Sequence, residues 1–156
     1  PHTMHSLDHK IPPPVIAVVC GGMAWRLAYF TPALNFDLPA RLPVVAVLVL
    51  VGLALDFSGL LSFFKAKTTF NPLAPSRSKV IVQSGLYRFT RNPMYLGMVF
   101  ELLGLSAYLA NPVALVGVVV FVVYITRFQI IPEERLLLAK FGEPYALYTR
   151  TVRRWL

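Results

Sequence analysis

Charged residues are scarce in this 156-residue chain: they make up 14% of the sequence, against 56% hydrophobic residues. This scarcity leaves several long stretches nearly free of charge, which excludes an ordinary soluble domain and is typical of an integral membrane protein. Acidic residues are fewer than basic ones: the chain has 7 Asp and Glu against 15 Lys and Arg, so its net charge is +8. Because the basic residues flank apolar spans, we interpret this charge as the positive-inside bias of cytoplasmic loops, and we expect no nucleic-acid partner.

Cysteine is nearly absent as well. The single cysteine, Cys20, lies inside an apolar run, so an internal disulfide is excluded and we interpret it as a small packing residue. The histidines at positions 2, 5 and 9 share no ligand spacing, and no metal site is predicted. Residues 1–14 form a polar N-terminal tail, of which residues 1–3 are expected to be a cloning remnant.

Four apolar segments predict an all-α integral membrane protein with about four transmembrane helices. The segments run from Val15 to Phe30, from Leu42 to Leu61, from Tyr95 to Ala110 and from Val113 to about Ile130. The turn at Asn111-Pro112 is short, so the last two segments are expected to form an antiparallel hairpin. We expect residues 15–62 to form two N-terminal helices and residues 63–156 to form a second region with the helix hairpin and the C-terminal helices.

The distribution of basic residues predicts the topology. The stretch from Phe63 to Asn92 holds six basic residues and no acid, and the stretch from Arg127 to Arg154 adds six more. The connection at residues 31–41 holds only Arg41, so both basic stretches and both termini are expected on the cytoplasmic side. Residues 133–141 predict a cytoplasmic amphipathic helix that Gly142 terminates.

The stretch from Ser84 to Gly97 passes from polar to apolar residues. Pro93 suits a first helical turn, so the third helix is expected to enter the membrane at Tyr95. Arg91 and Asn92 are then expected immediately before its first turn. Together with the carboxylates of Glu133 and Glu134, this end of the chain is suited to a zwitterionic ligand. The same residue types also suit lipid anchoring, in which arginines such as Arg153 and Arg154 contact anionic head groups and tyrosines line the interface.

Several short motifs occur in order and at close spacing: Gly85-Leu86-Tyr87-Arg88, Arg91-Asn92-Pro93-Met94-Tyr95-Leu96-Gly97, Asn111-Pro112, Glu133-Glu134 and Phe141-Gly142 with Tyr145 and Tyr148. Their combination resembles the isoprenylcysteine carboxyl methyltransferase and phospholipid methyltransferase superfamily of membrane enzymes. The resemblance covers about Thr68 to Arg154. It implies methyl transfer from S-adenosylmethionine, bound at the cytoplasmic side, to a lipophilic acceptor.

The resemblance also assigns site residues. Cofactor contacts are expected at Lys79, Val80, Ile81, Val82, Tyr87, Asn92, Pro93, Met94, Tyr95 and Glu133. Glu133 would accept hydrogen bonds from the cofactor's ammonium or ribose, the helix start near Asn92 would hold its carboxylate, and residues 80–82 would cover adenine.

Two positions depart from the eukaryotic isoprenylcysteine enzymes. Asn92 stands where they have a histidine, and it cannot titrate near neutral pH. Gln129 stands where they have a substrate-contacting arginine, and Arg127 lies two residues earlier, so both are expected substrate contacts. The acceptor therefore stays open between a carboxylate and an amine, on a lipophilic small molecule or a lipidated substrate.

Two acids lie inside the apolar segments, Asp56 in the second and Glu101 in the third, each about six residues from the cytoplasmic end. A charge at that depth costs about 2.5 to 3.5 kcal/mol on insertion scales, so such groups usually face a cavity or a partner. We expect Glu101 or Asp56 to bind or deprotonate an amine acceptor and Arg91 to act in the site. The alternative is that one acid pairs with Arg127 and stabilises the helix bundle.

The rival class is a non-catalytic membrane scaffold or lipid-binding protein that keeps the fold. The short chain is typical of a bacterial protein, so the inner membrane is the expected location, with the bilayer itself as partner. The sequence leaves the oligomeric state open.

Overall fold

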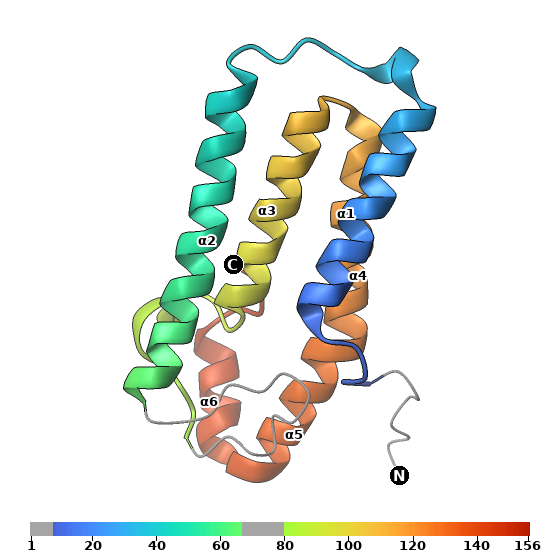
Figure 1. Ribbon diagram of the computed structural model, residues 1–156. Coiled ribbons are helices and arrows are strands. Elements are labelled where there is room, and N and C mark those ends of the chain that lie inside the picture. The colour runs from blue at the N-terminus through green and yellow to red at the C-terminus, as the bar shows by residue number, and fades with distance from the viewer. Residues whose placement is uncertain (1–7, 67–79) are drawn as a thin grey trace.

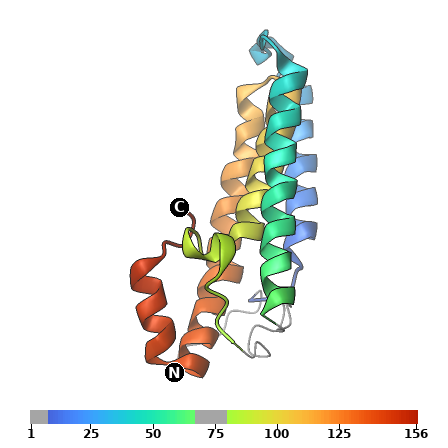
Figure 2. The same cartoon turned by 90° about the vertical axis from the view of Figure 1, so that its left-hand side faces the viewer.

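A computed structural model describes residues 8–66 and 80–156. Four long helices, α1 to α4, stand side by side along one axis, and two further helices, α5 and α6, lie beyond one end (Figure 1). Turned by 90°, α6 lies to one side of the four-helix bundle (Figure 2). The fold class is therefore all-α, as predicted, and the described residues form no β-strand beyond an isolated bridge between Thr90 and Arg153.

Helix α1 (Pro13–Phe30) begins at a proline, which suits a first turn because that residue lacks a backbone donor. Its buried residues Ile16, Cys20, Ala24 and Ala28 recur every four positions, so one face packs inward. Cys20 is buried, as predicted for a packing residue, and its backbone lies close to Gly117 of α4. The small side chains on this face let α1 and α4 approach closely.

Helix α2 (Arg41–Lys65) has 25 residues and packs through one narrow face against α3 (Pro93–Leu109). Glycines occupy the contacts on both helices, with Gly52 facing Gly97. The rest of α2 exposes large apolar side chains such as Leu50 and Phe57. Such a continuous exposed apolar surface is unfavourable in water and normal in hydrocarbon, so the helix faces lipid.

Helix α3 ends at Ala110, which adopts a left-handed conformation with φ of 46°, and a short 3₁₀ turn (Pro112–Ala114) leads into α4 (Leu115–Ile125). Asn111 is 1% exposed and organises this turn. Its Nδ2 donates to Thr31 O at 2.9 Å and to Asn35 Oδ1 at 2.8 Å, and its Oδ1 accepts from the Val113 N–H at 2.9 Å. The predicted hairpin is confirmed, and Asn111 also ties it to the end of α1.

Asn111→Ala is expected to lower the free energy of unfolding by about 2 to 4 kcal/mol, because several buried polar groups lose their partner together. Asn35→Ala is the matched control, since Asn35 is exposed and loses a single bond to Asn111. Chemical unfolding in detergent, followed by circular dichroism, measures both. An equal loss in the two variants would contradict the assignment of Asn111 as the organising residue.

The fourth span does not end where the sequence suggests. A π-helical segment (Thr126–Ile130) joins α4 directly to α5 (Ile131–Phe141), giving one helix of 30 residues from Pro112 to Phe141. Pro132 cannot donate to the carbonyl of Phe128, and the backbone N–H of His9 donates to that carbonyl instead, at 3.2 Å. The helix therefore passes the proline, and the expected amphipathic helix is its continuation.

Gly142 ends α5 with φ of 62°, as predicted, and α6 (Glu143–Thr151) starts immediately after it. At the opposite end of the bundle, the connection between α1 and α2 includes the short 3₁₀ helix η1 (Pro32–Leu34). Within residues 8–66 and 80–156, three helices are long and apolar enough to cross a membrane, namely α1, α2 and the joined helix that contains α4. Helix α3 is shorter, with 17 residues, and is about 25 Å long at 1.5 Å per residue. The chain is an integral membrane protein.

Candidate functional site

A cleft of about 680 Å³ lies at the end of the bundle where α5 and α6 are. The segment before α3, which includes the 3₁₀ turn η3 (Gly85–Arg88), supplies part of its wall, and the start of α3 supplies another part. The remaining walls come from α5, α6 and the end of α2.

The cleft collects most of the residues that the sequence assigned to a cofactor. Of those ten residues, eight line it: Val80, Ile81, Val82, Tyr87, Asn92, Met94, Tyr95 and Glu133. Pro93 is fully buried at the start of α3 and does not line the cleft. Lys79 lies outside the described residues. Segments as far apart as residues 80–82 and Glu133 thus meet in one cavity.

Apolar and polar groups occupy different parts of the cleft wall. Phe63, Ile130 and Leu137 add apolar surface to that of residues 80–82, and sequence reasoning did not assign these three to the site. Phe63 reaches the cleft because α2 extends to Lys65, beyond the predicted end at Leu61. Polar contacts come from the other side, where Tyr95 donates from its hydroxyl to Glu133 Oε2 at 3.3 Å.

The start of α3 contributes backbone donors. The first N–H groups of a helix have no acceptor within that helix. Met94 and Tyr95, both in the first turn of α3, line the cleft. The side chain of Asn92 does not cap α3; its Nδ2 donates to Arg154 O at 2.9 Å. An anion at this position would therefore meet backbone donors and a favourable helix dipole.

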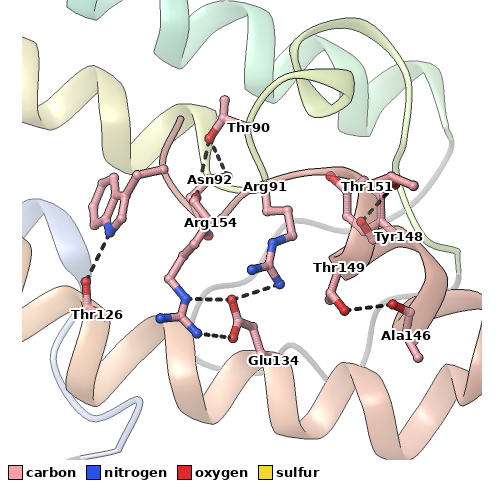
Figure 3. Close-up of polar contacts among 11 residues, drawn as sticks. Thr90, Arg91, Asn92, Thr126, Glu134, Ala146, Tyr148, Thr149, Thr151 and Arg154 are labelled. Atoms are coloured by element: carbon pink, nitrogen blue, oxygen red, sulfur yellow. Dashed lines mark hydrogen bonds and ion pairs between the residues drawn. The ribbon is translucent and has the colours of Figure 1, made fainter.

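Glu134 is the centre of the ionic contacts at the cleft (Figure 3). Its Oε1 lies 3.1 Å from Arg91 Nη1 and accepts from Arg154 Nε at 2.9 Å, and its Oε2 accepts from Arg154 Nη2 at 2.8 Å. The Arg154 pair is bidentate, and the contact with Glu134 raises the pKa of Arg154. The guanidinium of Arg154, whose side chain is 36% exposed, is thus held by Glu134.

The last residues of the chain, 152–156, form a segment that we call the C-terminal strap. The Arg91 N–H donates to Arg153 O at 3.0 Å, and Thr90 Oγ1 donates to Arg154 O at 3.4 Å. The strap thus holds the residues that precede α3 (Figure 3). No spacing in the sequence indicates this contact, because more than sixty residues separate the partners.

Three tyrosines complete the wall. Tyr148 donates from its hydroxyl to Tyr87 O at 2.7 Å and so connects α6 to η3. Burial raises the pKa of Tyr148, and burial also raises the pKa of Tyr87 and of Tyr145. All three phenols therefore remain protonated donors at neutral pH. Tyr145 and Tyr148, which belong to the last of the short motifs, are both buried, and both line the cleft.

The residues expected to be catalytic fall in two places. Arg91 lines the cleft, whereas Asp56 and Glu101 do not. These two acids lie at the contact between α2 and α3, Asp56 opposite Gly97 and Glu101 opposite Gly52, and the ion pairs of the described residues include neither of them. Their partner is therefore not Arg127, and the alternative that one of them pairs with Arg127 is wrong.

The expected substrate residues also lie outside the cleft wall. Gln129 is 2% exposed in the π-helical segment, where it lies within hydrogen-bonding reach of Tyr95. Arg127 stacks on the ring of Phe128 with 5.4 Å between its guanidinium carbon and the ring centre. Gln129 is therefore buried beside Tyr95 without lining the cleft, and Arg127 does not line it either.

The cleft offers complementary groups for a molecule that carries both charges. Glu133 supplies an acceptor, and Arg91 supplies donors. Arg91 Nε is buried and has no hydrogen-bond partner among the described residues, so it remains free to donate to a bound anion. The apolar wall suits a flat ring system, and tyrosine hydroxyls line the space between.

Several known proteins are similar in sequence to this chain. The family profile described as phospholipid methyltransferase matches residues 41–144. An uncharacterized protein of Haemophilus influenzae is 44% identical over 63 residues, which is 40% of this chain and all of that protein. The protein-S-isoprenylcysteine O-methyltransferase of Xenopus laevis is 32% identical over 109 residues, which is 68% of this chain and 37% of that enzyme. No solved structure matches the chain significantly.

Proposed function

Because this chain belongs to the phospholipid methyltransferase family of membrane proteins, we propose that it transfers a methyl group from S-adenosylmethionine to a lipophilic acceptor at the cytoplasmic face of the membrane. The observation that carries the proposal is the cleft itself. Eight of the ten residues that the family resemblance assigned to the cofactor line this single cavity. The frog relative is named as a methyltransferase, and it supports the same reaction class.

The chemistry of the cleft fits this cofactor. We propose that Glu133 accepts from the ammonium group or the ribose and that Tyr95 fixes the Glu133 carboxylate. Arg91 and the free N–H groups at the start of α3 would bind the cofactor's carboxylate. The apolar wall of residues 80–82 would cover the adenine ring, and Gln129 would keep Tyr95 in place.

Bound S-adenosylmethionine supplies an electrophilic methyl group: the acceptor's lone pair forms the new bond as the carbon–sulfur bond breaks and leaves its electron pair on sulfur. The protein's task in such a displacement is to align the two partners at roughly 3 Å and to exclude water. Buried Tyr87, Tyr95 and Tyr148 line the cleft and keep bulk water from it. A carboxylate acceptor needs no base, whereas an amine acceptor must first lose a proton.

The orientation of the protein follows from charge. Among the described residues, Arg91, Arg135 and Arg154 lie at the end of the bundle with the cleft, and basic residues near helix ends favour the cytoplasmic side. We therefore place the cleft and both termini in the cytoplasm, with a bacterial inner membrane as the location.

The proposal is tested by calorimetric titration of S-adenosylmethionine into the detergent-purified protein. Glu133→Ala removes a charge-assisted hydrogen-bond acceptor, worth about 1.5 to 3 kcal/mol, so the affinity is expected to fall by tenfold to a hundredfold. Glu143→Ala, an exposed acid at the start of α6, is the control and should bind normally. Absence of binding to the folded wild-type protein with lipid present would overturn the proposal and favour a scaffold or lipid-binding protein.

A further inference from the structure

A second hollow lies beside the cofactor cleft, between α5 and α6; we call it the outer groove. Arg91, Glu134 and Tyr145 line both the outer groove and the cleft, so they form the wall between the two. The outer groove is further lined by Ile131, Arg135 and Leu138 of α5, Thr149 and Arg150 of α6, and Arg154 of the strap. Figure 3 shows Glu134 on α5, with Arg154 and Thr149 on the chain that lies across from it.

The two helices place an arginine on each wall of the outer groove. After Gly142, α6 turns back toward the four-helix bundle (Figure 2), and the strap that follows it reaches the residues before α3. Arg135 precedes Gly142 by seven residues, and Arg150 follows it by eight. Because both arginines line the groove at nearly the same distance from the turn, they lie at a similar level on facing walls.

The length of the joined helix gives the depth of the outer groove. Its 30 residues from Pro112 to Phe141 span about 45 Å, whereas the hydrocarbon of a bilayer is about 30 Å thick. With Pro112 at one hydrocarbon surface, the other surface falls near Ile131, and Arg135 lies about 6 Å further along the helix. The head-group layer is roughly 5 to 8 Å thick on each side, so Arg135 lies at head-group depth.

Positive charge is in excess in the outer groove. Among the described residues, four arginines line it, and Glu134 is the only acid in its lining. Glu134 is already paired with Arg91 and Arg154, and Arg135 and Arg150 form no ion pair within the described chain. Arg154 donates to Glu134 through Nε and Nη2, which leaves its Nη1 group for another acceptor. Guanidinium groups on facing walls suit a phosphate, because its oxygens accept paired hydrogen bonds from arginine.

Apolar surface adjoins these arginines on the membrane side. Ile131, at the hydrocarbon border, is the groove residue of α5 nearest the membrane. Further into the hydrocarbon, α4 exposes Val120 and Val123. A lipid whose phosphate lies between the arginines would keep its acyl chains beside apolar side chains, whereas a free phosphate ion would leave that surface without a ligand.

We propose that the outer groove binds the phosphate group of an acidic phospholipid of the cytoplasmic leaflet, with Arg135 and Arg150 as the principal donors and Arg154 as a third. An acidic head group is favoured over a zwitterionic one, because a zwitterion would bring its ammonium group close to the same arginines. This lipid is not the methyl acceptor, since the wall of Arg91 and Glu134 lies between it and the cofactor cleft. Its binding attaches α6 to the membrane surface.

Native mass spectrometry of the detergent-solubilised protein measures this binding. The probe is phosphatidylglycerol, which is acidic and carries neither an amine nor a carboxylate to be methylated. Phosphatidylcholine with the same acyl chains is the zwitterionic comparison. The wild-type protein is expected to retain one molecule of phosphatidylglycerol at a concentration at least about tenfold lower than it needs for phosphatidylcholine.

Paired substitutions test the residues. Arg135→Gln with Arg150→Gln should remove the preference for phosphatidylglycerol, and Arg135→Lys with Arg150→Lys should keep part of it, because lysine retains the charge without the paired geometry. Arg88→Gln with Arg153→Gln is the matched control, since both arginines are exposed at the same end of the molecule and line neither hollow. All four arginines are exposed, so melting temperatures in lipid-free detergent should not change. Wild type and variant differ in mass and can be mixed, so that both meet the same lipid concentration.

The outcomes separate a lipid site from its alternatives. Equal loss in the Arg135/Arg150 and Arg88/Arg153 glutamine variants would show that diffuse surface charge attracts the lipid, and would overturn the inference. Inorganic phosphate should displace the lipid only at far higher concentration; displacement at an equal concentration would identify a site for soluble anions instead.

A last measurement separates this inference from the proposed function. Saturating S-adenosylmethionine and the Glu133→Ala substitution should both leave phosphatidylglycerol binding unchanged, because Glu133 does not line the outer groove. Mutually exclusive binding of the lipid and S-adenosylmethionine would place the head group in the cleft and overturn the separate site. Arginine-dependent lipid binding to a protein that binds no S-adenosylmethionine would support the outer groove and overturn the proposed methyl transfer alone.

Discussion

Glu134→Ala is expected to weaken the binding of S-adenosylmethionine by about a hundredfold or more. Glu134 accepts two charge-assisted hydrogen bonds from Arg154 and pairs with Arg91, and such bonds are worth about 1.5 to 3 kcal/mol each. The side chains of Arg91 and Glu134 are 12% and 18% exposed, against 36% for Arg154, so solvent screens the Arg91 pair least. Without Glu134, Arg91 loses its orientation and the C-terminal strap loses its ionic contact with α5.

Two measurements separate these effects. Calorimetry gives the loss of cofactor affinity, and limited trypsin digestion reports release of the strap, because Arg153 and Arg154 become accessible. A double-mutant cycle with Arg154→Ala isolates the Arg154 contribution. Glu143→Ala is again the matched control. Unchanged affinity with an intact strap in Glu134→Ala would show that the ionic contacts do not shape the cleft.

Gly97→Ala is expected to be the most destabilising single methyl addition in the protein, at about 3 kcal/mol or more of unfolding free energy. The added Cβ would overlap Asp56 Oδ1 and would lie 2.7 Å from Gly52 O. The second contact is with backbone and cannot be relieved by a rotamer change, so α2 must move away from α3. Because α2 packs chiefly on α3, such a movement separates the helix pair.

Gly22→Ala is the control for this variant, because its Cβ meets nothing within 4 Å, and alanine also has the better helix propensity. We expect it to leave stability unchanged or slightly raised. Combining Gly97→Ala with Asp56→Ala should recover only part of the loss, because the backbone overlap persists. Thermal unfolding of the detergent-solubilised proteins measures the series, and a melting temperature of Gly97→Ala equal to that of wild type would refute the close contact.

The helices themselves were largely predictable, because the length of each apolar segment and the prolines and glycines at its ends are local properties of the chain. Pro93 begins α3, the Asn111-Pro112 turn joins α3 to α4, and Gly142 ends α5, each as predicted. The exception is Pro132, which was expected to separate the fourth span from a cytoplasmic helix. The helix continues there because a distant residue, His9, supplies the missing donor to Phe128 O. A local rule fails where tertiary structure satisfies the same backbone group by another route.

The residues of the site were predictable in part, because several of them belong to short local motifs. Residues such as Asn92 and Glu133 belong to short motifs that the family resemblance carries, and they meet in the cleft. The roles of Phe63 and Arg154 in the cleft region could not be inferred, since neither belongs to a motif. Arg127 and Gln129 were assigned by position along the chain, and the π-helical segment places them away from the cleft wall.

By itself, the sequence determined that this chain is an integral membrane protein and where most of its helices begin. These properties follow from the cost of apolar surface in water and of unpaired backbone groups in lipid, which depends on the local residue pattern. The tertiary structure alone decided that Glu134 joins Arg91 to the C-terminal strap and that Asp56 lies opposite Gly97. Those contacts depend on the register of antiparallel helices and on the return of the chain after Gly142, and no local pattern encodes either.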